Sequence, residues 1–585
     1  MADFSPSATP GNEAPPEVLM GWFSQAIIFC LLVVIVLFSS LVLSEQQPAA
    51  FASPALFSLS VIGLWRWGWG CLHLVRAMFF RMVYFPSIRR RLDRIVAQRG
   101  PVPELSVLAT TFHEHLWITR IVIRSLIREF SLVQNLSAAP RLVFVTGGDD
   151  DDANVLAEFG GASDELMAAA ANGELTLPTF WPPTLTLLRG ADGKRSAIAK
   201  GLKHLRQEGV HPEGVIVLMD GDTAPELGAL KKVLPLFRES SRTGAVTTNE
   251  RPVIQAPAWF TEWIKLRFGQ RHLYMCSVGL SRRLLCLTGR LSAFRADLAT
   301  DVTFIDQIEN DSQRHWLFGE YRMFSGDDKS TWFWMSKNGY DLMYVPDAMV
   351  VTYEVISPKD SSITRGVANM KRWSGNMLRN AGRAAALGPR RLGIFTWLCT
   401  LDQQVSMWTV MIGPVAMLLA CFAGRYDFVA AYAIWLIATR TIRATIGWVH
   451  GRRFSPVYVP LQLASEWCGA VVKMWVYFHP VKQTWLNRGN RTLDSSKSIR
   501  FPKVRAGLAN YYFGYAIAGF VLAVGMYIGL VPILDELPLL QATENMTNQS
   551  MLGVTSVPAS VTPQQADVVF WGAKMTTSDT FDSDP

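Results

Sequence analysis

The sequence predicts an α/β membrane protein in which a globular domain is inserted between two groups of transmembrane helices. Apolar runs long enough to cross a bilayer gather near both ends of the 585-residue chain. Between them, short β-rich runs alternate with helical stretches, which is typical of a parallel sheet with crossover helices. Polar clusters that contain acidic residues follow three of these runs, at the place where such sheets bind their ligands.

The N-terminal part is predicted to cross the membrane twice. Residues 1–20 look disordered, and residues 21–78 hold the two crossings, Trp22–Leu43 and Phe51–Val75. The first apolar run is too long, and the residues before it too acidic, for a cleavable signal peptide. The arginine-rich residues 79–100 follow, so the positive-inside rule places this side and the N-terminus in the cytosol. We expect residues 79–100 to lie along the membrane surface, with arginines on lipid phosphates.

The net charge of +8 does not indicate nucleic acid as a partner, because the arginines and lysines gather beside the membrane segments. The seven cysteines include no CxxC pair and no zinc spacing. The sequence therefore predicts neither a structural zinc site nor a disulfide framework.

Residues 101–360 are predicted to form one cytosolic domain. Four β-rich runs are expected to be strands of its parallel sheet: Leu105–Ala109, Leu142–Val145, Leu185–Leu188 and Val215–Met219. Polar clusters at residues 110–114, 147–150 and 220–222 each follow one of these strands. Because parallel strands end at the same edge, three clusters there are better evidence for a binding site than any single motif.

The C-terminal part is predicted to return to the membrane, with interfacial helices over residues 361–402 and a channel region over residues 403–533. Three crossings are expected: Val405–Ala423, Phe428–Val449 and Leu508–Leu530. Residues 457–478 have basic flanks on both sides, so we expect an interfacial or re-entrant segment there.

The tail over residues 534–585 has almost no basic residues and is expected to be extracytoplasmic and disordered. It holds two glycosylation sequons, at Asn545 and Asn548, which could be used only on that side of the membrane. Sequons also arise by chance in tails rich in Asn, Ser and Thr, and the sequence leaves both interpretations open.

Asp220-Gly221-Asp222 ends a strongly apolar strand. Two carboxylates there can hold Mg²⁺ or Mn²⁺, which would in turn hold the diphosphate of a nucleotide-sugar. The pattern also occurs in ordinary turns, but its place at the ligand-binding edge favours a metal site. Lys194, in Gly193-Lys194-Arg195, precedes a helix-like run and could meet phosphate oxygens; the alternative is a solvated basic turn.

The segment over residues 325–329 offers a carboxylate for proton transfer. A sugar hydroxyl that attacks an anomeric carbon needs a base, and we expect Asp328 to be that base and Asp327 to support its loop. The alternative is that these acids cap a helix over Ser330–Lys337.

These motifs occur in the order found in processive family 2 glycosyltransferases. Asp220-x-Asp222, Gly326-Asp327-Asp328 and residues 369–373 resemble the family's D-x-D, its acidic triplet ending in the base, and its Q-x-x-R-W. Residues 288–295 resemble the acceptor segment S-G-P-L-G-M-Y-R, and residues 485–488 are similar to W-G-T-R. The likeness covers about residues 20–530 and is strongest to hyaluronan synthases and fungal type 2 glycosyltransferases.

The resemblance implies a GT-A-like, Rossmann-type catalytic domain and a role for each matching residue. Asp222 with Asp220 would hold the metal, Asp328 would be the base, and Trp373 would lie beneath the acceptor sugar. The remaining matches would bind nucleotide or substrate: Lys194, Gly289, Arg295, Asp327, Arg372 and Arg488.

Two departures from the family pattern stand out. Asn369 takes the place of Gln, which is one methylene longer. Thr146 stands where the family has an Asp that reads uracil, and Asp149 or Asp150 could take that role through a longer turn. The identity of the nucleotide is therefore less secure than metal binding.

The expected function is that of an inverting transferase in the plasma membrane, with a cytosolic active site. It would use a UDP-sugar and Mg²⁺ or Mn²⁺ to extend a β-linked cell-wall or extracellular polysaccharide and pass it through its own helices. Arg440 and Arg443 would line that path if they face the helix bundle. One alternative is a non-processive transferase to a lipid carrier, and another is a nucleotide-sugar-binding membrane protein with a decayed catalytic site.

Overall fold

The computed structural model describes residues 54–133, 136–190, 193–355, 361–449, 457–486, 492–494 and 500–528. The predicted crossing Trp22–Leu43, the candidate Arg488 and the tail with Asn545 and Asn548 lie outside these residues.

The domain is built on an eight-stranded sheet in the order β3-β2-β1-β4-β7-β6-β10-β5. Its strands are β1 (Leu105–Thr110), β2 (Arg141–Thr146), β3 (Thr184–Arg189), β4 (Val215–Asp220), β5 (Thr223–Pro225), β6 (Thr243–Gln255), β7 (Leu291–Arg295) and β10 (Asp341–Val355). The strands β3, β2, β1 and β4 are parallel. All four were predicted, and each prediction agrees with the structure to within one residue at either end.

The other half of the sheet corrects the expectation of a purely parallel sheet. Strand β7 runs antiparallel to both β4 and β6, and β5 runs antiparallel to β10. Because β7 reverses direction, it begins beside the carboxyl end of β4, with Leu291 opposite Met219. The loop before β7 therefore joins the edge where the parallel strands end.

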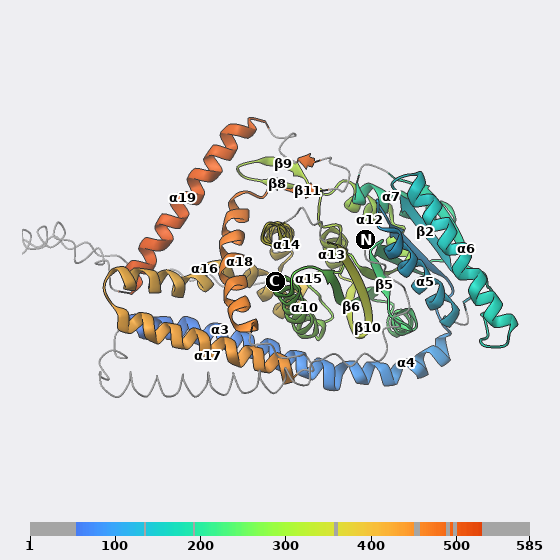
Figure 1. Cartoon of the computed structure of the whole chain (residues 1–585), viewed down its shortest axis with the longest axis horizontal. Coiled ribbons are helices and arrows are strands. Elements are labelled where there is room, and N and C mark those ends of the chain that lie inside the picture. The colour runs from blue at the N-terminus through green and yellow to red at the C-terminus, as the bar shows by residue number, and fades with distance from the viewer. Residues whose placement is uncertain are drawn as a thin grey trace, which may run out of the picture. The chain divides into compact units, whose positions relative to one another are not determined.

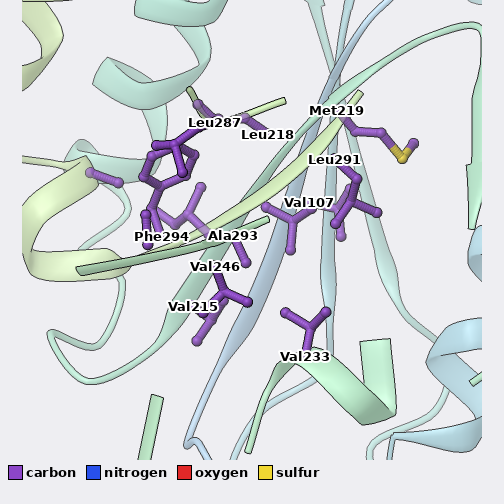
Figure 2. Close-up of a cluster of buried hydrophobic side chains, with 14 of the residues drawn as sticks. Val107, Val215, Leu218, Met219, Val233, Val246, Leu287, Leu291, Ala293 and Phe294 are labelled. Atoms are coloured by element: carbon purple, nitrogen blue, oxygen red, sulfur yellow. The ribbon is translucent and has the colours of Figure 1, made fainter. Parts of the chain in front are cut away.

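The centre of the sheet forms the hydrophobic core. Strand β4 is buried along Val215–Met219, as are Val107 on β1 and Ala293 on β7. Figure 2 shows part of this core and labels Val107, Val215, Leu218, Met219 and Ala293 together with Val233, Val246, Leu287 and Phe294. A strand packed on both faces reads as a continuous apolar run, which is why β4 was recognisable in the sequence.

Helices cover both faces of the domain (Figure 1). The longer ones are α5 (Leu116–Leu132), α6 (Asp149–Ala171), α7 (Lys194–Gln207), α10 (Ala258–Gly279) and α12 (Val302–Glu309). The shorter ones are α8 (Ala229–Val233), α9 (Leu236–Glu239) and α11 (Ala296–Ala299), and β8 (Ser312–His315) pairs with β9 (Gly319–Arg322). Helix α7 packs on β1 and β2, and α5 packs against α6.

Helix α13 (Asp327–Lys337) begins three residues before the helix expected at Ser330–Lys337. Gly326 precedes it with a φ of 84°, a left-handed conformation that glycine adopts without the penalty of a Cβ atom. Asp327 and Asp328 therefore occupy the first turn of the helix.

Further helices, most of them long, precede and follow the domain in the sequence. They are α3 (Pro54–Phe79), the π-helical turn η1 (Phe80–Tyr84), α4 (Phe85–Arg99), α14 (Ser362–Ala385), α15 (Gly388–Leu392), α16 (Ile394–Phe422), α17 (Tyr426–Val449), α18 (Tyr458–Phe478) and α19 (Pro502–Tyr527). A small hairpin, β11 (Thr484–Leu486) and β12 (Thr492–Asp494), follows α18. Helix α14 packs against α13, α16 and α18, and so joins the domain to the C-terminal helices (Figure 1).

Among the described residues, α16 and α19 are long and apolar enough to cross a membrane. The other expected crossings, at Phe51–Val75 and Phe428–Val449, fall on helices α3 and α17, and their insertion stays a prediction. Residues 458–478, where an interfacial or re-entrant segment was expected, form one unbroken helix, α18, and its placement in the membrane stays a prediction. Pro460 causes no break because it lies in the first turn, where its missing N–H is not needed.

Candidate functional site

The turn Asp220-Gly221-Asp222 is fixed at the carboxyl end of β4. The Gly221 amide donates to the carbonyl of Thr110 on the neighbouring strand, with N and O 2.9 Å apart. The carbonyl of Asp222 accepts from the amide of Tyr353 at 2.9 Å, and the Thr223 hydroxyl donates to Asp222 Oδ1 at 3.1 Å. The backbone of the turn is thus held by neighbouring strands, and both aspartates remain partly accessible.

Lys194 brings separate motifs together. Its Nζ lies 2.6 Å from Asp220 Oδ1 and 2.9 Å from Asp327 Oδ2. A Cβ atom on Gly289 would lie 3.3 Å from the same Nζ and less than 4 Å from both carboxylates. Four sequence segments therefore converge at one point: α7, the end of β4, the loop before β7 and the start of α13.

The two carboxylates raise the pKa of Lys194 well above its ordinary value, although burial acts in the opposite direction. Lys194 therefore remains a cation at any physiological pH. With the side chain held on two sides, it is placed to meet an anionic group that enters next to Gly289.

The charge of the D-x-D pair fits a divalent cation. Burial, and then the nearby Asp220 carboxylate, raises the pKa of Asp222 from 3.8 to about 7. A cation between the two would relieve this unfavourable charge, and carboxylates are the ligands that Mg²⁺ and Mn²⁺ prefer. Among the described residues, no group of three or more His, Cys, Asp or Glu side chains could hold a metal. Asp220 and Asp222 would thus share the ion with donor oxygens and water.

Asp327 and Asp328 are adjacent but differ in charge state. Burial opposes ionisation of Asp327, yet Lys194 and Arg195 lower its pKa below the ordinary value. Burial, followed by the neighbouring Asp327, raises the pKa of Asp328. A carboxylate with a raised pKa is the better proton acceptor, and the roles of Asp328 as base and Asp327 as support stay predictions.

Arg195 has a role that the sequence did not reveal. Its buried guanidinium donates to the carbonyls of Ile308 and Ser325, at 2.9 and 3.0 Å, and to the Ser330 hydroxyl at 2.9 Å. The second cation of the G-K-R segment thus holds the loop before α13 instead of facing a phosphate. Only the tertiary fold shows this difference between two neighbouring cations.

Arg290 is a second residue that the sequence reasoning missed. Its Nε lies 2.7 Å from the Thr352 hydroxyl and 3.3 Å from Glu250 Oε2, and Arg271 also pairs with the buried Glu250. Arg290 lowers the pKa of Asp222, against the effects of burial and Asp220. It stands where the family's acceptor segment has proline, and that departure was the available signal.

Arg372 and Trp373 lie on α14, as the motif order suggested. Arg372 Nη2 donates to Asn369 Oδ1 at 3.3 Å, so the shorter Asn side chain still reaches the arginine. The Trp373 ring stacks on Trp263 of α10, with centroids 6.2 Å apart and planes at 25°. The Trp373 side chain is partly exposed.

The acids after β2 divide into exposed and buried groups. Asp149 is almost fully exposed and pairs with Arg189, and Asp150 is also exposed on the first turn of α6. Asp151 was not singled out by the sequence. Its buried Oδ2 accepts from the amides of His113 and Gly147, at 3.2 and 3.1 Å. Asp151 therefore ties together the loops after β1 and β2, where a nucleotide base would lie.

Arg295 is not brought to this site. It lies opposite Val215, at the other end of β4 from Asp220, and pairs with Asp297 at 2.7 Å. The direction of β7 explains this, because Gly289 lies in the loop before the strand and Arg295 lies at the strand's far end.

Comparison with solved structures gives remote likenesses. A mannosyltransferase from Pyrobaculum calidifontis, solved with GDP-Man and Mn²⁺, is 16% identical with a TM-score of 0.39, covering 68% of this chain and 98% of that one. GalNAc-T7, solved with UDP, GalNAc and Mn²⁺, is 12% identical with a TM-score of 0.29, covering 52% of this chain and 54% of that one.

Sequence comparison is more informative. Residues 180–376, which contain the D-x-D, Gly289 and Asp328, match the family described as glycosyltransferase like family 2. Glycosyltransferase alg8 of Pseudomonas syringae pv. tomato is 34% identical over 436 residues, covering 74% of this chain and 85% of that protein. The glycosyltransferase alg8 of Azotobacter vinelandii is 32% identical over 444 residues, covering 75% and 86%. The chain therefore belongs to the family 2-like glycosyltransferases, together with the alg8 glycosyltransferases of these two organisms.

Proposed function

We propose that the protein is a processive, inverting glycosyltransferase of the plasma membrane, with its active site in the cytosol. It transfers sugar from a nucleoside diphosphate to a growing β-linked polysaccharide and passes the product through its own helices. The donor suggested by the family resemblance is a UDP-sugar. Because Thr146 stands at the base-reading place, GDP-sugars belong in the same test.

One observation carries this proposal: Lys194 contacts Asp220 and Asp327 at once, with Gly289 directly beside them. A diphosphate is an anion that needs cations, and a sugar acceptor needs a base within reach of the same donor. Asp327 lies more than a hundred residues from both Lys194 and Asp220 in the sequence, yet all three side chains are adjacent in the fold.

The residues suggest the following chemistry. The acceptor hydroxyl attacks the anomeric carbon and gives its proton to Asp328, while the bond from that carbon to the diphosphate oxygen breaks. The electron pair leaves with the nucleoside diphosphate, and attack from the opposite side inverts the anomeric configuration. Lys194 meets the charge that develops on the leaving group. A metal ion held by Asp220 and Asp222 would supply further stabilisation of that charge.

Charged residues between the long helices support a polar path for the product. Arg66 of α3 pairs with Asp402 of α16 at 2.6 Å. Arg440 and Arg443 of α17 both pair with Glu466 of α18, so they face a neighbouring helix of the bundle. Ionic groups within membrane-spanning segments are costly and typically mark a path for polar substrates.

The proposal is tested by nucleotide release from the detergent-purified protein, with a panel of UDP- and GDP-sugars, in Mn²⁺ or EDTA. We expect metal-dependent release with one or two donors and a loss of about 10² to 10⁴-fold in Asp328→Asn. Nucleotide binding without release in the wild-type protein would instead support a binding protein with a decayed site.

Processive transfer and transfer to a lipid carrier are separated by Trp373→Ala. A polymerase needs the ring beneath its acceptor sugar, so polymer length and yield should fall about tenfold or more while donor hydrolysis persists. The reaction is extracted with organic solvent, which takes up a lipid-linked product and leaves a polysaccharide in the water phase, and the product in each phase is then sized. A short, lipid-extractable product that is unchanged in the variant would overturn the polymerase proposal.

A further inference from the structure

The loop that directly precedes the proposed base is hydrogen-bonded to α14. Ser325 and Gly326 directly precede Asp327 and Asp328, and the Ser325 hydroxyl donates to Asn376 Oδ1 at 2.8 Å. Arg379 Nη2 donates to the same amide oxygen at 2.6 Å and lies 3.5 Å from the Ser325 hydroxyl. Two glycines make room for this arrangement. A Cβ atom on Gly326 would lie 2.9 Å from Asn376 Cγ, and one on Gly375 would lie 2.8 Å from Arg379 Nη1.

Arg379 is an unusual group to bury. Its side chain is nearly inaccessible, and its other nitrogen, Nη1, donates to the Pro480 carbonyl beyond the end of α18 at 3.1 Å. Within the described residues it forms no ion pair with an acidic side chain, and its Nε has no hydrogen-bond partner. Burial lowers its pKa to about 10. An apolar side chain of similar volume would pack there without this desolvation cost, so packing alone does not account for an arginine.

The same loop is held from the donor side. Arg195 donates to the Ser325 carbonyl at 3.0 Å, and its neighbour Lys194 holds Asp327 at 2.9 Å. Ser325 therefore lies between two buried guanidinium groups: that of Arg195, next to the donor site, and that of Arg379 on α14, the helix that also carries Trp373. The position of the base relative to donor and acceptor depends on both.

We propose that Arg379 is a positioning residue that sets the balance between sugar transfer and donor hydrolysis. It does so by fixing the base loop against α14, and the inference rests on the proposed transferase function. In transfer, the proton passes to Asp328 from the acceptor hydroxyl; in hydrolysis, it passes from water, and the products are free sugar and nucleoside diphosphate. A water molecule can follow a displaced base, whereas a sugar stacked on Trp373 cannot, so loosening the loop impairs transfer more than hydrolysis.

The test is Arg379→Lys in the full-length protein in detergent, with the donor that the wild-type enzyme uses. Sugar incorporated into polymer and free sugar released are measured in the same reaction. We expect the ratio of transfer to hydrolysis to fall about tenfold or more, because small displacements of reacting groups have large effects on rate. The KM for the donor should change by less than about twofold, because Lys194 and the D-x-D are untouched.

Arg383→Lys is the matched control. Arg383 lies one turn further along α14 and pairs with buried Asp311 at 2.7 and 2.9 Å, an ion pair that a lysine can keep. Within the described residues it has no direct bond to Ser325 or Gly326, and its link to them runs through Asp311 and the Ser330 hydroxyl. We expect it to lower thermal stability and leave the ratio unchanged. Ser325→Ala reaches the Arg379 contact from the other side and should lower the ratio even if Arg379→Lys fails to fold.

The outcomes are distinct. A lower ratio in Arg379→Lys and Ser325→Ala, but not in Arg383→Lys, supports the inference. An unchanged ratio, or an equal fall in all three variants, overturns it and leaves the proposed function standing. Absence of any transfer by the wild-type protein would remove the proposed function itself.

Discussion

The two halves of the sheet contribute differently to the site. The parallel half, β3-β2-β1-β4, ends in the acids and cation-bearing turns that would act on the substrate. The mixed half, β7-β6-β10-β5, supplies Gly289, Arg290, Glu250 and Thr352, which set the space and charge around those acids. The D-x-D acids are thus local features of a strand end, and Lys194 follows another strand, while the candidate base Asp328 comes from the start of α13 and the residues around these groups come from the mixed half. The following predictions test whether this division of roles is correct.

The largest effect is expected for Asp222→Asn in the parallel half. The substitution removes one of two protein ligands for the metal, and a neutral amide binds a hard cation poorly. Affinity for Mn²⁺ should fall at least about a hundredfold, measured by titrating donor turnover with Mn²⁺. The control is Asp149→Asn, which changes an exposed carboxylate at the same edge of the sheet. Unchanged Mn²⁺ dependence in Asp222→Asn would show that the metal lies elsewhere.

Metal affinity should also depend on pH. Since burial and Asp220 raise the pKa of Asp222 to about 7, the metal must displace a proton below that pH. The apparent Mn²⁺ affinity should therefore fall about tenfold for each pH unit below 7 and level off above it, because one proton is exchanged. Calorimetric titrations with Mn²⁺ from about pH 5.5 to about pH 8.5, a range that brackets the pKa, would measure this. A flat profile would mean that Asp222 is already ionised in the metal-free protein.

A smaller effect is expected for Arg290→Gln in the mixed half. The variant loses the contacts to Thr352 and Glu250, but Arg271 still pairs with Glu250. Stability should fall by about 1–3 kcal/mol through the weakened buried network, and turnover by severalfold. Thermal unfolding and kcat are compared with those of Arg290→Lys, which keeps the charge. If Arg290→Gln matched the wild type in both, the mixed half would contribute little beyond the backbone.

The smallest effects separate the acids that follow β2. Asp151→Asn should destabilise the protein by about 1 kcal/mol, because a neutral amide oxygen is a weaker acceptor than a carboxylate for the amides of His113 and Gly147. Asp149→Asn should stay within about 0.5 kcal/mol of the wild type, since its ion pair is exposed. Both are measured by thermal unfolding, with donor KM as the second readout. A larger loss of stability in Asp149→Asn than in Asp151→Asn would assign the structural role to the exposed acid.

The parallel half could be predicted because its information is local. Short apolar runs in the sequence predicted the ends of β1, β2, β3 and β4 to within one residue. The order of the motifs indicated the family. Strand β7 could not be foreseen as antiparallel, because its short sequence carries no mark of direction. The error over Arg295 follows from this, since the motif suggested proximity where the reversed strand creates separation.

The network around Ser325 was beyond prediction for a different reason. Arg195, Asn376 and Arg379 come from distant parts of the chain, and they converge only because α7, α13 and α14 pack together. A sequence distinguishes a cation from an apolar residue, but not a phosphate-binding arginine from one that holds a loop. That distinction required the tertiary contacts.

Gly221 imposes a limit on how this site can change. A Cβ atom there would lie 2.7 Å from the Thr110 carbonyl oxygen and 2.9 Å from Thr111 Cβ, which is too close for any side chain. Because β1 and β4 pair along their full length, neither strand can move aside without breaking the core. A library built to alter donor choice should therefore leave this position fixed and vary side chains in the loops after β1 and β2, at the edge where such sheets bind their ligands.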